Sequence, residues 1–320
     1  MKIKKTILLV FFIFITLFLA EIGFRLLVKF DIVDYPKPDF EKIIHKYSAI
    51  KGLIYELKAS SSSEDGLIRT NKFGIRDIEY TLAKPKDTTR ICVIGDSVAF
   101  GYGENHPLLA LEKIFSEILE KRLNENSEHK YEVLNFSVIG YNAFQEQIVL
   151  KEKVMKFSPD FVIIAYVPND DTYTGGLGEL AREMAPHSLG PVLHSKLVSY
   201  VLYRWERKNF YNMSNMNMIW DLFRTIQALK ANEKFEAIIL MTSENNDLNH
   251  WDSKHELVKK NAISSGLAVI DLREKWRSLN PEYRETLYLP GEIHYTERGM
   301  QETADALVSF FKEKKGRTLF

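Results

Sequence analysis

The chain has 320 residues, 45% of them hydrophobic, and its 43 basic and 43 acidic side chains give a formal net charge of zero. This length can bury one large core or two small ones, and the balanced charge argues against the clustered basic face of a nucleic-acid-binding protein. Cys92 is the only cysteine, which excludes intramolecular disulfides and cysteine-rich zinc sites. Because it lies in an apolar run, we expect its thiol to be buried and inert.

Residues 1–30 form an apolar N-terminal segment that we interpret as a membrane anchor. Three lysines precede the uncharged run Thr6–Ala20, and apolar residues continue to Val28, which makes the segment long enough to cross a bilayer. The alternative is a cleaved signal peptide followed by secretion. Cleavage after Ala20 would place Phe18 at the −3 position, where a small residue is preferred, so the sequence favours the anchor. In both cases the lysines predict that the remaining chain lies outside the cytoplasm.

Residues 31–85 are predicted to be an irregular extracytoplasmic extension, because DYPKPDF, ASSSSEDG and KPKDTT interrupt the segment with proline-rich or polar stretches. The main domain is predicted over residues 86–320. It carries an insertion at about 171–230 with helical stretches.

Apolar runs and helical periodicity alternate through this domain. We expect strands at 90–95, 132–136, 160–167, 235–242 and 267–272, and helices at 109–123, 142–157, 253–264 and 302–312. The run 160–167 is apolar on both faces, which is typical of the centre of a parallel sheet. The alternation predicts an α/β fold with a mainly parallel sheet of five strands.

Polar residues follow the expected strands, at the sheet edge where open parallel sheets bind their ligands. They are Asp96 and Ser97 after the first strand, Ser137 and Gly140 after the second, Asn169 and Asp170 after the third, residues 243–247 after the fourth, and Glu292 and His294 beyond the fifth.

This set contains the residue types of nucleophilic catalysis. A histidine such as His294 can take the proton of Ser97, and a carboxylate such as Glu292 can orient the imidazole. The backbone N–H groups of Ser97 and Gly140, with the side chain of Asn169, could stabilise an oxyanion. We expect the other seven of the eight histidines to lie in polar loops or exposed helical turns.

Each residue also has a plain structural alternative. Asp96 and Ser97 could cap the following helix, while Gly140, Asn169 and Asp170 could belong to ordinary turns. A phosphate-binding loop is the weaker alternative for ICVIGDSVAFGYG, because its glycines do not fit G-x-G-x-x-G and no Gly-Lys-Ser/Thr sequence follows.

Four blocks of the sequence together resemble the SGNH (GDSL-type) hydrolase family: IGDSVAFG (94–101), NFSVIGYN (135–142), VPND (167–170) and GEIHYTERG (291–299). The resemblance implies a flavodoxin-like, three-layer α/β/α sandwich. It also implies Ser97 as nucleophile, His294 as base, and Gly140 and Asn169 as partners of Ser97 in the oxyanion hole. We expect Asp96 to brace the turn at Ser97 and Asp170 to play a supporting role. We expect no cofactor, and no metal, because no His/Asp/Glu cluster has ligand spacing and a serine mechanism needs none. The segment RTNKFGIRD (69–77) resembles a lead-in found in membrane-anchored members.

Two positions depart from the family pattern. Val167 stands where the third block usually has glycine, and Gly291 stands where an aspartate usually lies three residues before the histidine. Glu292 is offset by one residue, as in relatives that acetylate extracellular polysaccharides. We predict that Glu292 is the orienting acid; the alternatives are a backbone carbonyl in that role or reduced activity.

Three functions follow as hypotheses. The first is a membrane-anchored, extracytoplasmic esterase or O-acyltransferase that acts on acyl esters, such as O-acetyl groups of a cell-surface glycan. The second is a lipid-directed esterase with an apolar lid in the insertion, formed by Tyr200, Tyr203, Trp205, Met213, Met216 and Met218, for which the plain alternative is a helical subdomain. The third is a non-catalytic glycan-binding or assembly protein, suggested by Val167 and Gly291.

Overall fold

The computed structural model describes residues 2–30, 32–33, 44–53, 55–103, 106–171, 195, 197–198, 200–201, 215–242 and 253–317. The chain forms two compact units. One comprises Met1–Asp39 with Tyr173–Met213, and the other comprises Phe40–Thr172 with Ser214–Phe320.

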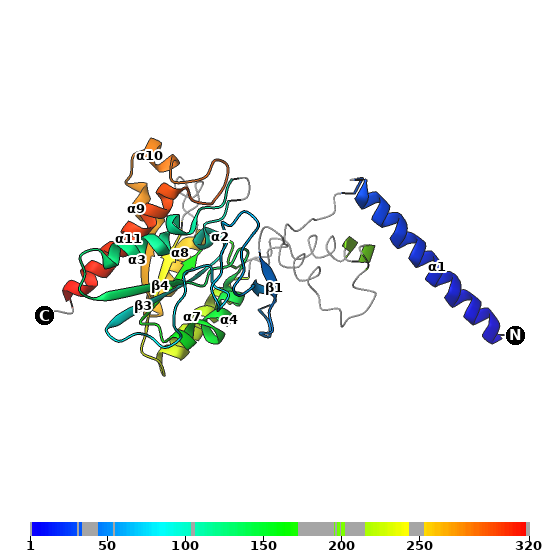
Figure 1. Cartoon of the computed structure of the whole chain (residues 1–320), viewed down its shortest axis with the longest axis horizontal. Coiled ribbons are helices and arrows are strands. Elements are labelled where there is room, and N and C mark those ends of the chain that lie inside the picture. Colours follow the sequence, from blue (N-terminus) through cyan, green and yellow to red (C-terminus); the bar gives the residue numbers. More distant parts are fainter. Residues whose placement is uncertain are drawn as a thin grey trace. The chain divides into compact units, whose positions relative to one another are not determined.

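The first unit contains the long helix α1 (Lys2–Lys29), whose stretch Lys5–Lys29 has a mean hydropathy of 2.7 over its most apolar window (Figure 1). At 1.5 Å per residue these 25 residues extend about 38 Å, more than the roughly 30 Å of a bilayer's hydrocarbon core. Arg25 pairs with Glu21 at 2.7 Å, so two of the helix charges neutralise each other. A signal sequence near the N-terminus can also be this apolar over such a length, so the anchor and the cleaved peptide both stay predictions.

The second unit is built on five parallel strands: β3 (Thr88–Gly95), β4 (Lys130–Asn135), β5 (Phe161–Tyr166), β6 (Glu236–Met241) and β7 (Ala268–Asp271). Their order in the sheet is β4-β3-β5-β6-β7, and every adjacent pair is parallel. The chain reverses its winding direction beside β3, as in flavodoxin-like folds. The predicted flavodoxin-like fold with five parallel strands is confirmed.

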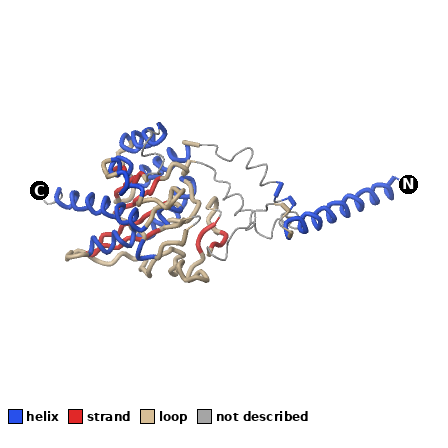
Figure 2. Tube along the Cα trace, turned by 90° about the horizontal axis from the view of Figure 1, so that it is seen from above, coloured by secondary structure: helices blue, strands red, loops and turns tan. Residues whose placement is uncertain are grey.

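Helices cover both faces of this sheet. Ile91 and Val93 of β3 pack in one core with Leu119 of α3 (Phe115–Asn124) and Leu307 of α11 (Glu297–Arg317). The intervening Cys92 and Ile94 are equally buried and point to the other face, because successive strand residues alternate. That face carries α4 (Ala143–Glu152) and α7 (Asn217–Lys230), and Figures 1 and 2 show the strands between the two helical layers. Burial raises the pKa of the Cys92 thiol, as expected of an inert cysteine.

The remaining helices and turns in the described part of this unit are α2 (Ser97–Phe100), the 3₁₀ turns η1 (Leu111–Lys113) and η2 (Val154–Phe157), α8 (Ser253–Ser264), α9 (Leu272–Arg277) and α10 (Pro281–Glu285). The sequence did not predict α9 and α10, whose five or six residues are too few to show a helical period. The last helix begins at Glu297, five residues earlier than predicted.

The segment before β3 is more regular than its composition indicates. Strands β1 (His45–Tyr47) and β2 (Tyr55–Leu57) form an antiparallel pair, and Ser62 bridges Arg69. The prediction of an irregular extension is therefore wrong for this part of residues 31–85. The hairpin makes contacts with residues far along the chain, such as the ion pair between Lys153 and Glu56 at 3.0 Å. Contacts of this kind leave no pattern in the local sequence.

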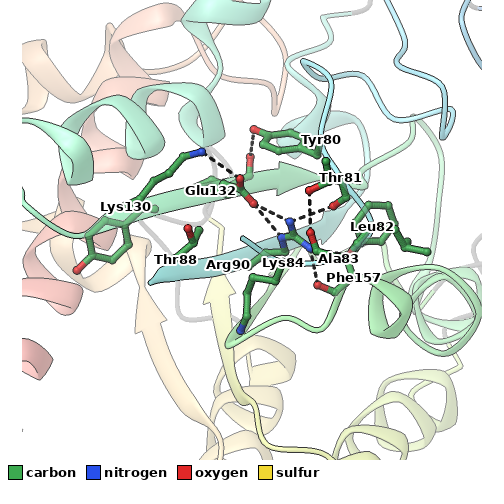
Figure 3. Close-up of polar contacts among 12 residues, drawn as sticks. Tyr80, Thr81, Leu82, Ala83, Lys84, Thr88, Arg90, Lys130, Glu132 and Phe157 are labelled. Atoms are coloured by element: carbon green, nitrogen blue, oxygen red, sulfur yellow. Dashed lines mark hydrogen bonds and ion pairs between the residues drawn. The ribbon is translucent and has the colours of Figure 1, made fainter. Parts of the chain in front are cut away.

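Figure 3 shows how the sheet holds the end of this segment. Arg90 of β3 is fully buried and pairs with Glu132 of β4 at 2.7 Å. The other hydrogen bonds of its guanidinium go to the carbonyl oxygens of Thr81, Leu82 and Phe157 at 2.7–3.0 Å. The guanidinium thereby fixes residues 81–82 against the amino-terminal end of β3.

The insertion is described only in part. Helix α7 is the helical stretch expected there, and it buries Met218. Tyr203, Trp205 and Met213, on which the apolar-lid hypothesis depends, lie outside the described residues.

Candidate active site

Ser97 lies directly after β3, at the first residue of α2, and its residue is 8% exposed. The Asp96 carboxylate accepts a hydrogen bond from the Val98 N–H at 2.9 Å and so caps this helix. A Cβ at Gly95 would lie 2.9 Å from the Ala99 Cβ and 3.0 Å from that of Ala165, too close for any other residue. The glycine therefore lets the strand turn sharply into the helix and present the serine at the sheet edge.

Ser97, His294 and Glu292 form a hydrogen-bonded chain. The Ser97 Oγ lies 2.9 Å from the His294 Nε2, and the His294 Nδ1 lies 3.0 Å from the Glu292 Oε2. The side chains of His294 and Glu292 are each 5% exposed, so little water weakens these contacts. Such a chain can transfer the serine proton to the imidazole while the carboxylate stabilises the resulting imidazolium.

The turn before His294 explains why the acid stands at Glu292. The Glu292 N–H donates to the Leu289 carbonyl at 3.1 Å, and Gly291 has φ +76°. With Pro290 at its second position and a left-handed residue at its third, this is a type II turn, which favours glycine. An aspartate at position 291 would be strained there, whereas Glu292 follows the turn and reaches the imidazole.

The chain passes close to this acid on a second side. A Cβ at Gly103 would lie 3.3 Å from the Glu292 Oε2 and 2.5 Å from the Leu289 Cδ1. The glycine therefore permits the loop after α2 to lie against the Glu292 carboxylate.

Two residues near the triad had no assigned role in the sequence. The Tyr102 ring meets the edge of the His294 ring at 5.6 Å between centroids. The His106 Nε2 lies 3.9 Å from the Glu292 Oε1, and its side chain is 30% exposed. The prediction of polar loops or exposed helical turns is wrong for His45 and His255, which are buried. Both are buried by residues distant in sequence, so no local signal could have identified them.

The candidate oxyanion donors lie in the loops that flank Ser97. The Val138 N–H donates to the Gly95 carbonyl at 3.1 Å, which holds the Gly140 loop beside the turn that carries Ser97. Gly140 has φ +76°. In the part of the chain that the structure describes, no protein group accepts a hydrogen bond from its N–H.

Asn169 is half-buried in the turn after β5. The next residue, Asp170, connects this turn to its neighbours: its carboxylate accepts from the Val167 N–H at 2.8 Å, and its carbonyl accepts from the Ala143 N–H at 2.9 Å. Asp170 thereby joins the Asn169 turn to the start of α4.

Three buried carboxyl groups lie behind these loops: Asp96, Glu146 and Asp170. Burial raises the pKa of each, and repulsion from neighbouring carboxylates adds to the rise for Glu146 and Asp170; together the two causes raise the pKa of Glu146 to about 8. Among the described residues, neither oxygen of Glu146 has a hydrogen-bond partner, nor does the Asp170 Oδ1. The raised pKa favours the protonated, neutral form of Glu146 at neutral pH.

No group of three or more His, Cys, Asp or Glu side chains within the described ranges could hold a metal ion. Residues 243–247, which the sequence also places at this edge, lie outside those ranges.

Similar folds occur among solved structures at low sequence identity. A lipase/acylhydrolase from Enterococcus faecalis is 15% identical, with a TM-score of 0.46; the match covers 72% of this chain and 96% of that one. A variant of an acetyl xylan esterase from Geobacillus stearothermophilus is 17% identical, with a TM-score of 0.46 and coverage of 69% and 93%. Another acetyl xylan esterase is 14% identical, with a TM-score of 0.45 and coverage of 69% and 98%. No family model and no curated protein matches the chain.

Proposed function

We propose that this chain is a serine esterase or O-acyltransferase of the SGNH type. The observation that carries the proposal is the continuous contact from the Ser97 Oγ to the His294 Nε2 at 2.9 Å and from the His294 Nδ1 to Glu292 at 3.0 Å. A serine with this base and acid at a sheet edge is the arrangement that activates a hydroxyl at neutral pH.

In the first half-reaction, His294 removes the Ser97 hydroxyl proton as the oxygen attacks the ester carbonyl carbon. The negative charge that develops on the carbonyl oxygen is stabilised by the N–H groups of Ser97 and Gly140 and by the side chain of Asn169. The tetrahedral intermediate then collapses, and His294 donates its proton to the departing alcohol. The acyl group stays on Ser97 as an ester.

In the second half-reaction, His294 removes a proton from water or from an acceptor hydroxyl, which attacks the acyl-enzyme. Glu292 stays a carboxylate throughout and stabilises the imidazolium at each step. Hydrolysis and acyl transfer therefore use the same residues and differ in the acceptor admitted to the site.

We assign the catalytic unit to the extracytoplasmic side of a membrane, with α1 as its anchor and an O-acetylated glycan as substrate. The assignment is supported by the lysines at the amino-terminal end of α1, by the length of that helix, and by the resemblance of the four sequence blocks and the lead-in to the SGNH family. The triad does not identify the acyl group or the glycan, because the triad requires only an ester carbonyl.

The test uses the full chain in detergent with 4-nitrophenyl acetate. Ser97→Ala is expected to lower turnover by about 10³-fold or more, because nucleophile and base act as one unit. Ser309→Ala is the matched control, because Ser309 is an exposed serine of α11 outside the proposed triad. This variant should retain wild-type turnover. A fluorophosphonate should label the wild type and not the Ser97→Ala variant.

Three outcomes would contradict parts of the proposal. Wild-type turnover in Ser97→Ala would remove Ser97 as nucleophile. Absence of both turnover and labelling in the wild type would favour a non-catalytic, glycan-binding scaffold. A strong preference for long acyl chains over acetate would favour a lipid substrate.

A further inference from the structure

The N-terminal hairpin contacts the loop that carries the proposed oxyanion donor Gly140. The Tyr55 hydroxyl of β2 donates a hydrogen bond to the Ile139 carbonyl at 2.8 Å. Further bonds run from the Tyr141 hydroxyl to the Tyr55 carbonyl at 2.8 Å and from the Gln145 side chain to the Leu53 carbonyl at 3.2 Å. The N-terminal segment thus binds the Gly140 loop at two points and the first turn of α4 at a third.

The bond from Tyr55 falls on one particular peptide group. The Ile139 carbonyl and the Gly140 N–H belong to the same peptide, and the structure contains no cis peptide bond in its described part. In a trans peptide the C=O and N–H bonds point in opposite directions. A hydrogen bond that fixes the carbonyl therefore also fixes the direction of the Gly140 N–H, on the far side of the peptide from Tyr55.

From this geometry we infer that Tyr55 is a positioning residue for the Gly140 peptide: its hydroxyl orients and polarises the N–H that stabilises the oxyanion. The inference rests on the proposed function, because it assigns the Gly140 N–H to the developing negative charge. A hydrogen bond accepted by the carbonyl also draws electron density from the N–H, which makes that N–H a stronger donor.

The surroundings of Tyr55 suit a fixed donor. The residue is 1% exposed, and its ring packs between His45, at 5.1 Å between centroids, and Tyr141, at 5.3 Å. Burial raises the pKa of Tyr55 well above its ordinary value, so the phenol keeps its proton over the working pH range.

Gly140 leaves the room that this contact needs. A Cβ at position 140 would lie 3.1 Å from the Tyr55 hydroxyl oxygen, and the backbone there has φ +76°. Glycine at position 140 therefore serves both the backbone conformation and the approach of the tyrosine.

The test is Tyr55→Phe, which removes one oxygen and retains the ring. The loss of one neutral hydrogen bond should lower kcat about tenfold and leave KM nearly unchanged, because the Gly140 N–H acts chiefly on the tetrahedral state. The affinity for an alkyl trifluoromethyl ketone, whose adduct with Ser97 carries an oxyanion, should fall by a similar factor.

Tyr80→Phe is the matched control. Tyr80 is a buried tyrosine of the same N-terminal segment, and its hydroxyl donates to Glu120 at 2.9 Å rather than to the Gly140 loop. It should lose stability, as Tyr55→Phe does, and keep the wild-type kcat and ketone affinity. Wild-type kcat and ketone affinity in Tyr55→Phe would overturn the inference, as would equal losses of kcat in both variants.

Two further measurements separate the possible failures. If Ser97→Ala is inactive while Tyr55→Phe is unimpaired, only the role of Tyr55 is lost; if Ser97→Ala is active, the proposed function itself is lost. Should Tyr55→Phe fail to fold, 3-fluorotyrosine at position 55 retains the hydroxyl and makes it a stronger donor. A kcat at or above the wild-type value supports the inference, and a reduced kcat overturns it.

Discussion

The two ends of the central sheet bury ionisable side chains in opposite ways. At the amino-terminal end, all five N–H donors of Arg90 are used, by Glu132 and by three backbone carbonyls (Figure 3). At the carboxyl-terminal end, Glu146 and Asp170 are equally buried, yet three of their four carboxyl oxygens have no hydrogen-bond partner among the described residues.

The difference indicates which end of the sheet serves stability and, under the proposed function, which end serves catalysis. A buried ion pair with every donor satisfied holds strands together and leaves no group ready to react. Unsatisfied carboxyls destabilise the fold, and they lie at the end where Ser97, His294 and Glu292 meet. Substitutions at the two ends should therefore change different measured quantities.

The largest expected effect is on activity, from Glu292→Gln. An amide cannot stabilise the imidazolium and can hold His294 in the wrong tautomer, so kcat should fall by about 10²–10⁴-fold. The melting temperature should change little. Glu285→Gln, an exposed change on α10, is the control and should leave kcat unchanged. A kcat within twofold of wild type would show that another acceptor, such as a backbone carbonyl, orients the His294 Nδ1.

The matching effect on stability comes from Arg90→Met. Removal of the cation leaves Glu132 buried beside only the exposed Lys130, so the free energy of unfolding should fall by about 3–5 kcal/mol. Urea denaturation measures this loss, and kcat of the folded fraction should stay at the wild-type value. The double change Arg90→Met with Glu132→Leu should recover part of the stability. Equal losses from Arg90→Met and from the exposed control Lys130→Met would refute the contrast.

A smaller, pH-dependent effect is expected from Glu146→Gln. Burial raises the pKa of Glu146 from 4.5 to about 8, so between these values the folded state holds a proton that the unfolded state has released. The contribution of this group to stability is therefore complete below about pH 4.5 and is lost as the pH rises to about 8.

A neutral glutamine does not ionise, so the Tm of Glu146→Gln relative to wild type should rise steadily from pH 4.5 to pH 8. Thermal unfolding at several pH values measures the trend. Glu152→Gln, an exposed change on the same helix, should show no such trend. A constant Tm difference across this range would mean that Glu146 is already ionised in the folded state.

The smallest effect is expected from His106→Gln. Its contact with Glu292 is long, at 3.9 Å, and partly exposed, so its loss should lower kcat by no more than about fivefold. His129→Gln provides the control, because that imidazole contacts Thr89 on the amino-terminal side of the sheet at 2.7 Å. A loss as large as that of Glu292→Gln would make His106 an essential partner of the acid.

Much of the fold could be predicted because its signals are local. Each of the five strands is a short apolar run, and each run lies within two residues of the observed strand. The hairpin β1–β2 could not be predicted, because its two strands have three residues each and depend on contacts with the Gly140 loop. In the same way, His45 and His255 are buried by residues distant in the sequence, so no periodic pattern around them indicates their burial.

By itself, then, the sequence determined which residue types stand at the carboxyl ends of the strands, because parallel strands deliver their following residues to one edge. Only the tertiary structure decided which acid meets His294. The left-handed backbone at Gly291 disfavours a side chain there, and the turn it makes brings Glu292 to 3.0 Å from the imidazole. Tertiary structure also brought Tyr55 to the Ile139 carbonyl, 84 positions away in the sequence, since the two meet only when the hairpin packs on the sheet.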